Sequence, residues 1–257
     1  MKRRNFLAGA AAAGFAAAAP AAEGGNQFYE LRFYKVRNDQ TKQRERLIEF
    51  LKNQHLPMTR RLGIGPVGYF QVHLGPDMPR IVTLTAYGSD AEIGAKQRAM
   101  MEDEKWMKAL EEAGRGAPLF DRVQAWLLRA FDGMKKLEVP PEKKGGGAHF
   151  FDLRIYESAS FERHYRKVEM FNEGGEIAIF RRCGLNPVFF GQTLFGAKMP
   201  NLVYMLWYDD WNARQAAWGK FRKDPDWERI RRDPKYANTV SNITNTFLQP
   251  LEFSPIR

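Results

Sequence analysis

The chain has 257 residues, of which 44% are hydrophobic and 27% are charged, a composition typical of a folded globular protein rather than a disordered chain. Its single cysteine, Cys183, excludes an internal disulfide, so packing alone must stabilise the fold. The formal charge of +10 favours acidic or anionic partners, but no basic block, zinc-finger spacing or RNA-binding aromatic motif accompanies it, so we expect no nucleic-acid binding.

Residues 1–22 have the features of an export signal. A basic start over residues 1–4 precedes an alanine-rich stretch, and we expect cleavage after Ala21 or Ala22, where the residues are small. The arginine pair ahead of Phe6 resembles a twin-arginine signal, and a general secretory signal is the alternative. We expect a periplasmic or secreted protein after cleavage. No later stretch reaches about 18 apolar residues, so we expect no membrane span.

An internal repeat is the most informative feature of the sequence. When residues 60–87 are aligned with residues 181–208, an offset of 121, eleven of the 28 positions are identical, against about two expected by chance. Near the start of each copy the offset is 122, and Leu31-Arg32 matches Leu153-Arg154. The repeat predicts two homologous domains in one chain.

The domain boundaries follow from the repeat and from a stretch rich in Pro, Lys and Gly. We expect the first domain over residues 27–133, a linker over residues 134–148 and the second domain over residues 149–254. Each domain is predicted to run β-α-β-β-α-β, the ferredoxin-like arrangement. One sheet face would stay bare, so we expect the two sheets to cover each other in a barrel-like α+β fold.

The elements of the first copy are predicted from periodicity and turn residues. Apolar residues at helical spacing predict a helix over residues 40–62 that ends at Gly63, and Ser89 is a candidate N-cap for a second helix. Strands are predicted over residues 28–36, 67–74, 80–87 and 120–131. The second copy repeats this order, with Asp209-Asp210 as candidate cap residues and a last strand over residues 243–253.

His55 is the candidate catalytic residue. It lies near the end of the first helix, two residues before Pro57, and a neutral imidazole there can act as a general base or as a metal ligand. A helix C-cap that interacts with the helix dipole is the alternative. The second copy has Glu176 and Ala178 at these positions, so a site that uses His55 belongs to the first copy alone. We expect no metal site and no bound cofactor, because haem ligation by His55 lacks a second ligand motif.

Three tyrosines and one arginine are candidate ligand-binding residues. Tyr34, Tyr69 and Tyr87 lie on predicted strands, where aromatic side chains can line a pocket or simply fill a core. Arg61, in a pair with Arg60 that recurs in the second copy, can hold a carboxylate or phosphate, or can form a basic last helical turn. The expected partner is a small aromatic or anionic molecule.

Short motifs in both copies resemble a NIPSNAP domain. They are the segment Phe28-Tyr29-Glu30-Leu31-Arg32-Phe33-Tyr34, His55-x-Pro57, Gly63-x-Gly65 and the segment around Trp106, with a similar opening at residues 151–156. The resemblance implies a dimeric α/β-barrel fold with two ferredoxin-like units per barrel. Related families on that fold include cofactor-free monooxygenases, isomerases and haem enzymes, and the fold alone does not choose among them.

Two hypotheses for function follow. The first is a small-molecule binding protein, or an enzyme without a tightly bound cofactor, with a pocket in the first domain near His55, Arg61 and Tyr34. Oxygenase or isomerase chemistry would suit such a pocket. The second is a non-catalytic binding or assembly scaffold, and a homo-oligomer is compatible with both. The difference between His55 and Glu176 is the sequence feature that separates them.

Overall fold

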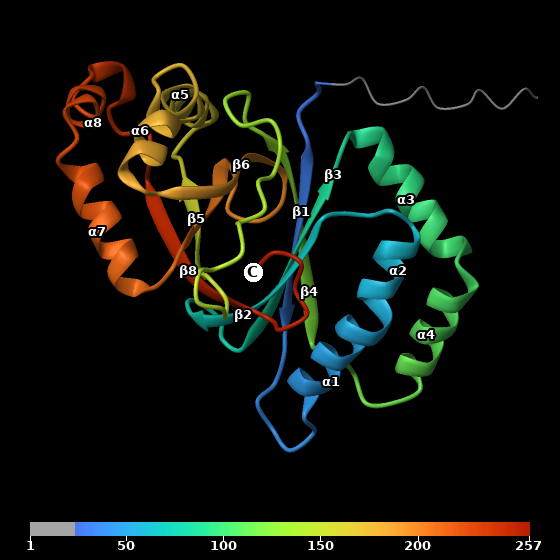
Figure 1. Ribbon diagram of the computed structural model, residues 1–257. Helices are drawn as coiled ribbons and strands as arrows, with labels where there is room; N and C mark the ends of the chain where they lie inside the picture. Colours follow the sequence, from blue (N-terminus) through green and yellow to red (C-terminus); the bar gives the residue numbers. More distant parts are fainter. Residues whose placement is uncertain (1–23) are drawn as a thin grey trace, which may run out of the picture.

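The computed structural model describes residues 24–257, and the export signal predicted over residues 1–22 lies outside them. The first half contains β1 (Phe28–Lys35), α1 (Gln43–Phe50), the π-helical turn η1 (Leu51–His55), α2 (Leu56–Arg61), β2 (Val67–Leu74), β3 (Arg80–Tyr87), α3 (Asp90–Glu102), α4 (Glu104–Gly114) and β4 (Arg122–Ala130) (Figure 1). The second half contains β5 (Phe150–Glu157), α5 (Phe161–Phe171), α6 (Glu176–Cys183), β6 (Asn186–Phe195), β7 (Asn201–Tyr208), α7 (Trp211–Arg222), α8 (Pro225–Ile230), the 3-10 turn η2 (Pro234–Tyr236) and β8 (Asn242–Pro250). The same order of elements in both halves confirms the duplication.

The eight strands form one closed, antiparallel barrel in the order β1-β3-β2-β8-β5-β7-β6-β4. Each half contributes four adjacent strands, and the halves join where β2 pairs with β8 and β4 pairs with β6. The edge strands of one half are therefore hydrogen-bonded to those of the other. This closure goes further than the expected covering of one sheet by another, because it leaves no open sheet edge.

Apolar side chains fill the barrel. Alternation along β1 directs Tyr29, Leu31 and Phe33 inward, and the barrel core also holds Phe70 and Phe151, whose ring centroids are 5.1 Å apart. The two halves thus share one hydrophobic core, and its packing stabilises both halves together.

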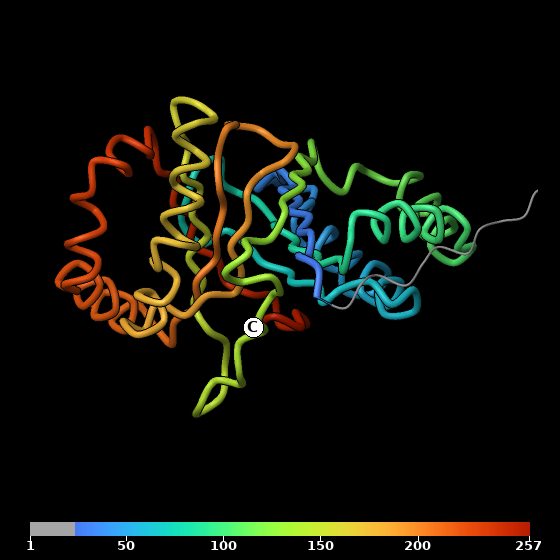
Figure 2. Tube along the Cα trace, turned by 90° about the horizontal axis from the view of Figure 1, so that it is seen from above, coloured from blue at the N-terminus to red at the C-terminus, as the bar shows by residue number. Residues whose placement is uncertain are grey.

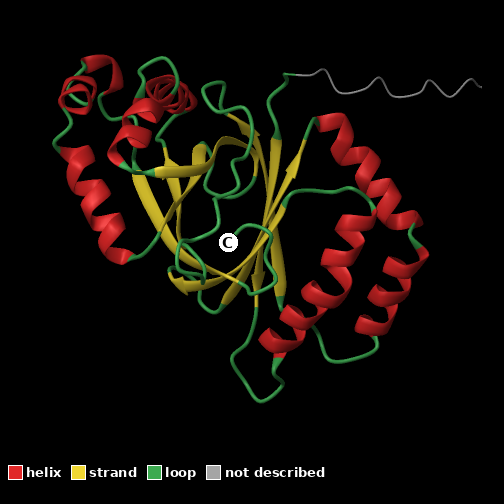
Figure 3. Cartoon of the chain, viewed as in Figure 1, coloured by secondary structure: helices red, strands yellow, loops and turns green. Residues whose placement is uncertain are grey.

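The helices of the two halves lie outside the barrel, on opposite sides of it (Figures 1 and 2), and Figure 3 shows the strands enclosed between them. The expected N-caps are present. Ser89 accepts a hydrogen bond from the Glu92 N–H at the start of α3, and Asp210 accepts one from the Ala213 N–H at the start of α7.

The helix predicted over residues 40–62 is confirmed from Gln43 to Arg61, but it is shorter than expected and its middle part, Leu51–His55, is a π-helical turn rather than regular α-helix. Pro57 has no N–H to donate, and the Leu56 N–H bonds to the carbonyl of Leu51, five residues earlier, which makes the wide turn η1. The predicted final strands are also too long: β4 begins at Arg122, and β8 ends at Pro250, which cannot donate to the sheet.

The segment between the halves, residues 131–149, is only partly exposed. Met134 is buried, the Glu138 N–H bonds to the carbonyl of Val188, and residues 144–147 are exposed. The C-terminal segment also packs on the barrel, where Ile256 is fully buried in the core. Among residues 24–257, no helix has the length and apolar character needed to cross a membrane.

Candidate functional site

A cavity of about 390 Å³ lies outside the barrel, between the sheet of the first half and its helices. We call it the helix-side cavity. Its polar lining consists of Arg32, Tyr34 and His55, and its apolar lining of Leu47, Phe50, Leu51, Trp106, Leu110, Leu119, Phe120, Val123 and Ala125. A mostly apolar lining with a few polar groups is typical of a small-molecule site.

Strand alternation explains which side chains reach this cavity. Arg32 and Tyr34 on β1 face the helices, whereas Phe33 between them lies in the barrel core. On the neighbouring strand β4, Ala125 is opposite Arg32 and Val123 is opposite Tyr34. Because Ala125 is small, it leaves open space beside the Arg32 guanidinium.

His55 reaches the cavity from the end of the π-helical turn η1. Its side chain is buried, and its Nδ1 lies 2.7 Å from the Tyr69 hydroxyl. Burial, and then the positive charge of Arg32, lower the pKa of His55 to about 4, so the imidazole is neutral at physiological pH. Burial raises the pKa of Tyr69, which therefore stays protonated. The predicted residues His55 and Tyr69 thus form one hydrogen-bonded unit.

Arg32 connects the cavity to a second, much smaller hollow of about 10 Å³, which is also lined by Glu30, His55, Thr83 and Tyr87. The Arg32 Nε donates to Glu30 Oε1 at 2.8 Å, and the Tyr87 hydroxyl lies 3.3 Å from Glu30 Oε2. Burial opposes the charge of Arg32, but Glu30 and Tyr34 raise its pKa, so it remains a cation. Tyr87 therefore supports the polar end of the site without lining the helix-side cavity.

Arg61 does not line the cavity. Its guanidinium makes two contacts of 2.7 Å with the carboxylate of Asp103, which also caps α4. The hydrogen bonds from Arg61, and then that from the Trp106 N–H, lower the pKa of Asp103 to about 2. Arg182 pairs with Asp224 in the same way in the second half. The repeated arginine thus ties two helices together in each half.

Arg32 is the residue that sequence reasoning did not select. The available signal was its recurrence as Arg154 at the same place in the repeated first strand, on the polar side of an alternating pattern. A cation retained on the helix-facing side of both sheets indicates a role beyond solubility.

In the second half, aromatic side chains pack around the equivalent arginine, Arg154. The Arg154 Nε donates to the Tyr204 hydroxyl at 2.9 Å, and its guanidinium lies 4.6 Å from the Trp218 ring. Tyr204 stands opposite Arg154 as Thr83 stands opposite Arg32, so a tyrosine fills the space that threonine leaves open. Glu176, at the position of His55, is buried in an ion pair of 2.7 Å with Lys167.

The comparison with known proteins agrees with this architecture. The sequence matches the NIPSNAP family over residues 29–130 and 151–255, which span both halves of the barrel. The chain belongs to the NIPSNAP family. A search of curated proteins finds no significant match to this NIPSNAP protein.

Solved structures share the fold of this NIPSNAP protein at low sequence identity. A protein from Fusobacterium nucleatum, provisionally assigned as a monooxygenase, is 9% identical with a TM-score of 0.57, over 89% of this chain and 94% of that chain. A second provisionally assigned monooxygenase, from Lactobacillus acidophilus, is 8% identical with a TM-score of 0.57, over 88% of this chain and 94% of the other. An anthrone oxidase-like protein is 11% identical with a TM-score of 0.51, over 89% and 92%.

Potential metal ligands are scattered in this NIPSNAP protein. Within residues 24–257, no three His, Cys, Asp or Glu side chains are grouped closely enough to hold a metal ion. The polar groups that line the helix-side cavity are those of Arg32, Tyr34 and His55.

Proposed function

We propose that the first half binds a small, largely apolar or aromatic molecule that carries one carbonyl or acidic group, and that it acts on this molecule without a cofactor. The helix-side cavity is the observation that carries this proposal. Its volume of about 390 Å³ falls within the range of about 300–1,000 Å³ found for small-molecule sites. We interpret the two halves as ferredoxin-like units, of which one keeps a working pocket.

The lining favours one orientation of the ligand. Phe50, Trp106 and Phe120 present rings to an aromatic body, and Arg32 offers a cation to its polar group. Leu110 and Phe120 are 40% and 36% exposed, so the apolar end of the cavity opens toward solvent. A ligand would therefore enter with its charged or carbonyl group leading toward Arg32.

His55 and Arg32 suit proton abstraction from such a ligand. A neutral His55 would accept the proton of an acidic C–H or O–H, and the Arg32 guanidinium would stabilise the anion that forms. Reaction of that anion with molecular oxygen would be an oxygenation, and return of the proton to another carbon would be an isomerisation. The oxygenase and oxidase assignments of proteins with this fold support the first of these.

Binding of an anionic aromatic dye, 1-anilinonaphthalene-8-sulfonate, tests the proposal. Ala125→Phe should fill the space beside Arg32, and Arg32→Gln should remove the cation, so both variants should bind the dye at least about tenfold more weakly than the unmodified protein. Phe161→Ala is the matched control, because Phe161 is an exposed aromatic residue of the second half. Dye binding that is lost in the control and kept in Ala125→Phe would refute a pocket in the first half.

A non-catalytic scaffold is the second candidate, and the filled barrel interior favours it. Leu31, Leu128 and Leu153 are fully buried in the middle of the barrel, so this part of the interior serves packing rather than ligand binding. Oxygen consumption in the presence of aromatic carbonyl compounds separates the two candidates. Consumption that depends on His55 supports the enzyme, whereas dye binding with no turnover of any such compound supports the scaffold.

Export to the periplasm through the twin-arginine route is a further part of the proposal, and the residues at the start of the sequence support it. The double substitution Arg3→Lys and Arg4→Lys should retain the full-length precursor in the cytoplasm, because it keeps the charge and removes the arginine pair. Cell fractionation measures this. Unchanged appearance of the processed protein outside the cytoplasm would favour the general secretory signal.

A further inference from the structure

One end of the barrel carries an unusual concentration of positive charge. Two adjoining hollows of about 150 and 140 Å³ share Phe33, Asp77, Arg80 and Gln124 as lining residues. The first hollow also contacts Lys35 and Arg122, and the second also contacts Lys198. We call these two hollows together the barrel mouth. It lies on the inner face of β1 and β4, opposite the helix-side cavity, so it is a separate site.

Three of these cations form a row across three neighbouring strands. Lys35 on β1 stands opposite Arg80 on β3 and opposite Arg122 on β4. Like charges in directly opposite positions repel each other and destabilise a sheet. The strands are fixed by the barrel, so these side chains cannot separate by moving to another register. The row therefore costs stability unless an anion lies beside it.

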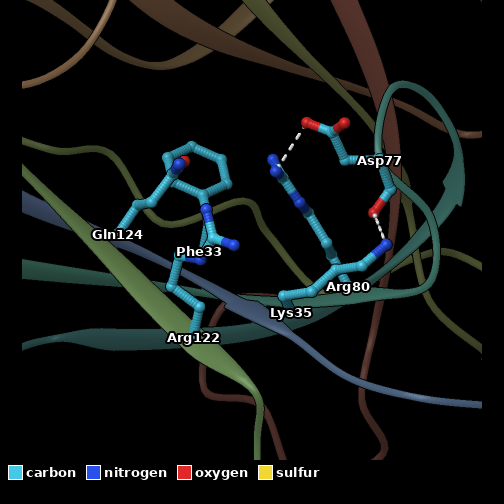
Figure 4. A pocket seen from close by; sticks show the side chains of 6 residues that line it. All are labelled: Phe33, Lys35, Asp77, Arg80, Arg122 and Gln124. Carbon is cyan, nitrogen blue, oxygen red and sulfur yellow. Dashed lines mark hydrogen bonds and ion pairs between the residues drawn. The ribbon is translucent and has the colours of Figure 1, made fainter.

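The neighbouring groups compensate this charge only in part. Arg80 bonds to the Asp77 carboxylate at 2.6 Å, and Lys35 donates to the carbonyls of Asp77 and Met78 at 3.1 and 3.2 Å (Figure 4). The Nε of Arg80 is buried without a hydrogen-bond partner. Arg122 makes no ion pair within the part of the chain that the structure describes, and Figure 4 shows it beside Gln124 and Phe33.

The second half supplies a built-in comparison. At the positions equivalent to Arg80, Lys35 and Arg122 it has Asn201, Glu157 and Asn242, which form the same row on β7, β5 and β8. The fold of the repeated strands therefore does not require cations at these three positions. Lys198, which also reaches the barrel mouth, is already 3.5 Å from Glu157 and donates to Thr244.

We propose that the barrel mouth binds a phosphate group, either as the free ion or carried on a small organic molecule. A doubly charged oxyanion matches the excess of three cations over one carboxylate in the first hollow. Guanidinium groups on β3 and β4 can each present two parallel N–H donors to phosphate oxygens. Gln124 adds an amide donor, and Phe33 closes the floor.

Thermal unfolding and calorimetric titration with inorganic phosphate test this site. Phosphate should raise the melting temperature above that in chloride at equal ionic strength, because it binds the folded chain alone. Lys35→Gln with Arg122→Gln should abolish the rise and should melt higher than the unmodified protein in chloride, because repulsion within the row is relieved. Arg129→Gln is the control, since Arg129 lies on β4 outside the mouth and pairs with Asp132.

The outcomes separate clearly. The proposal is overturned if the unmodified protein has the same melting temperature in phosphate as in chloride. It is also overturned if phosphate raises the melting temperature of the double variant as much as that of the unmodified protein. If the double variant folds poorly, the single variants Lys35→Gln and Arg122→Gln replace it: each should weaken calorimetric binding about tenfold, and unchanged binding in both overturns the proposal. Tighter binding of phenyl phosphate than of inorganic phosphate identifies an organic phosphate as the ligand, and the reverse order identifies the free ion.

Discussion

At the scale of single residues, the hydrogen bond between His55 and Tyr69 positions the candidate base. The Tyr69 hydroxyl lies 2.7 Å from His55 Nδ1, and both side chains are buried. A hydroxyl can donate or accept, so the contact suits either neutral tautomer of the imidazole. Its removal leaves a buried ring nitrogen without a partner, which is more costly than the loss of an exposed bond.

Tyr69→Phe should lower the free energy of unfolding by about 1–2 kcal/mol and weaken dye binding, because His55 loses its fixed orientation. Tyr29→Phe is the matched control. The Tyr29 hydroxyl is buried without a hydrogen-bond partner, so its removal should leave stability unchanged or higher. Urea unfolding measures both effects. Equal losses of unfolding free energy in the two variants would show that the hydrogen bond between Tyr69 and His55 adds nothing to stability.

The pH dependence of stability should report the buried state of His55. An unfolded histidine titrates near 6.5, whereas burial lowers the pKa of folded His55 to about 4. Between these values the unfolded chain binds more protons, so stability is fully present above pH 6.5 and falls as the pH drops toward 4. Burial lowers the pKa of His164 to about 4 as well, so it contributes in the same window.

Comparison of unfolding free energies at pH 7 and pH 4.5 isolates this contribution. His55→Gln should reduce the acid-induced loss of stability by roughly 2 kcal/mol, since a pKa difference of one unit corresponds to about 1.4 kcal/mol. His164→Gln should reduce it independently, which makes it an internal comparison. An acid-induced loss that is identical in His55→Gln and the unmodified protein would mean that His55 titrates normally in the folded chain.

At the scale of elements, the wide turn η1 delivers His55 to the cavity. The Leu56 N–H reaches back to the Leu51 carbonyl, and Pro57 cannot restore regular helical bonding at the next position. Pro57→Ala supplies the missing N–H, which can bond to the Asn53 carbonyl and tighten the turn. The change would rotate His55 relative to Tyr69.

We therefore expect Pro57→Ala to weaken dye binding severalfold while the melting temperature stays the same or rises, because alanine favours a helix interior over proline. Fluorescence titration and a thermal melt measure the two quantities. Pro225→Ala is a suitable comparison, because Pro225 begins α8 in the second half, away from the helix-side cavity. A drop in melting temperature with unchanged dye binding would show that Pro57 acts on stability alone.

At the scale of the whole molecule, the pairing of β2 with β8 and of β4 with β6 makes the two halves one cooperative unit. Leu128→Ala removes a fully buried side chain of β4 from the shared core and should cost about 2–5 kcal/mol. Calorimetry should show a single unfolding transition that shifts as a whole. Two separate transitions, of which only one shifts, would show that the halves unfold independently.

Much of this architecture could be predicted from the sequence, because identities such as Gly63 with Gly184 reveal the repeat and alternation reveals the strands. Closure of the barrel could not, since pairing between edge strands of different halves leaves no local pattern. At the site, His55 was selected from its contrast with Glu176. The helix-side cavity depends on the small residue Ala125, and the small hollow beside it depends on Thr83. Space that arises because a side chain is small leaves no recognisable pattern in a single sequence.

Thr83 in the first half and Tyr204 in the second half occupy equivalent positions, opposite Arg32 and Arg154. This difference allows the two halves to take different roles. In a barrel assembled from two identical chains, every substitution appears twice, so a tyrosine that plugs one pocket also plugs its twin. Fusion into a single polypeptide removes this constraint. One half can then be rigid, with aromatic rings packed around Arg154, while the other keeps the small hollow beside Arg32 that Thr83 lines. The two halves of a single polypeptide can therefore differ in function, which two copies of one chain cannot.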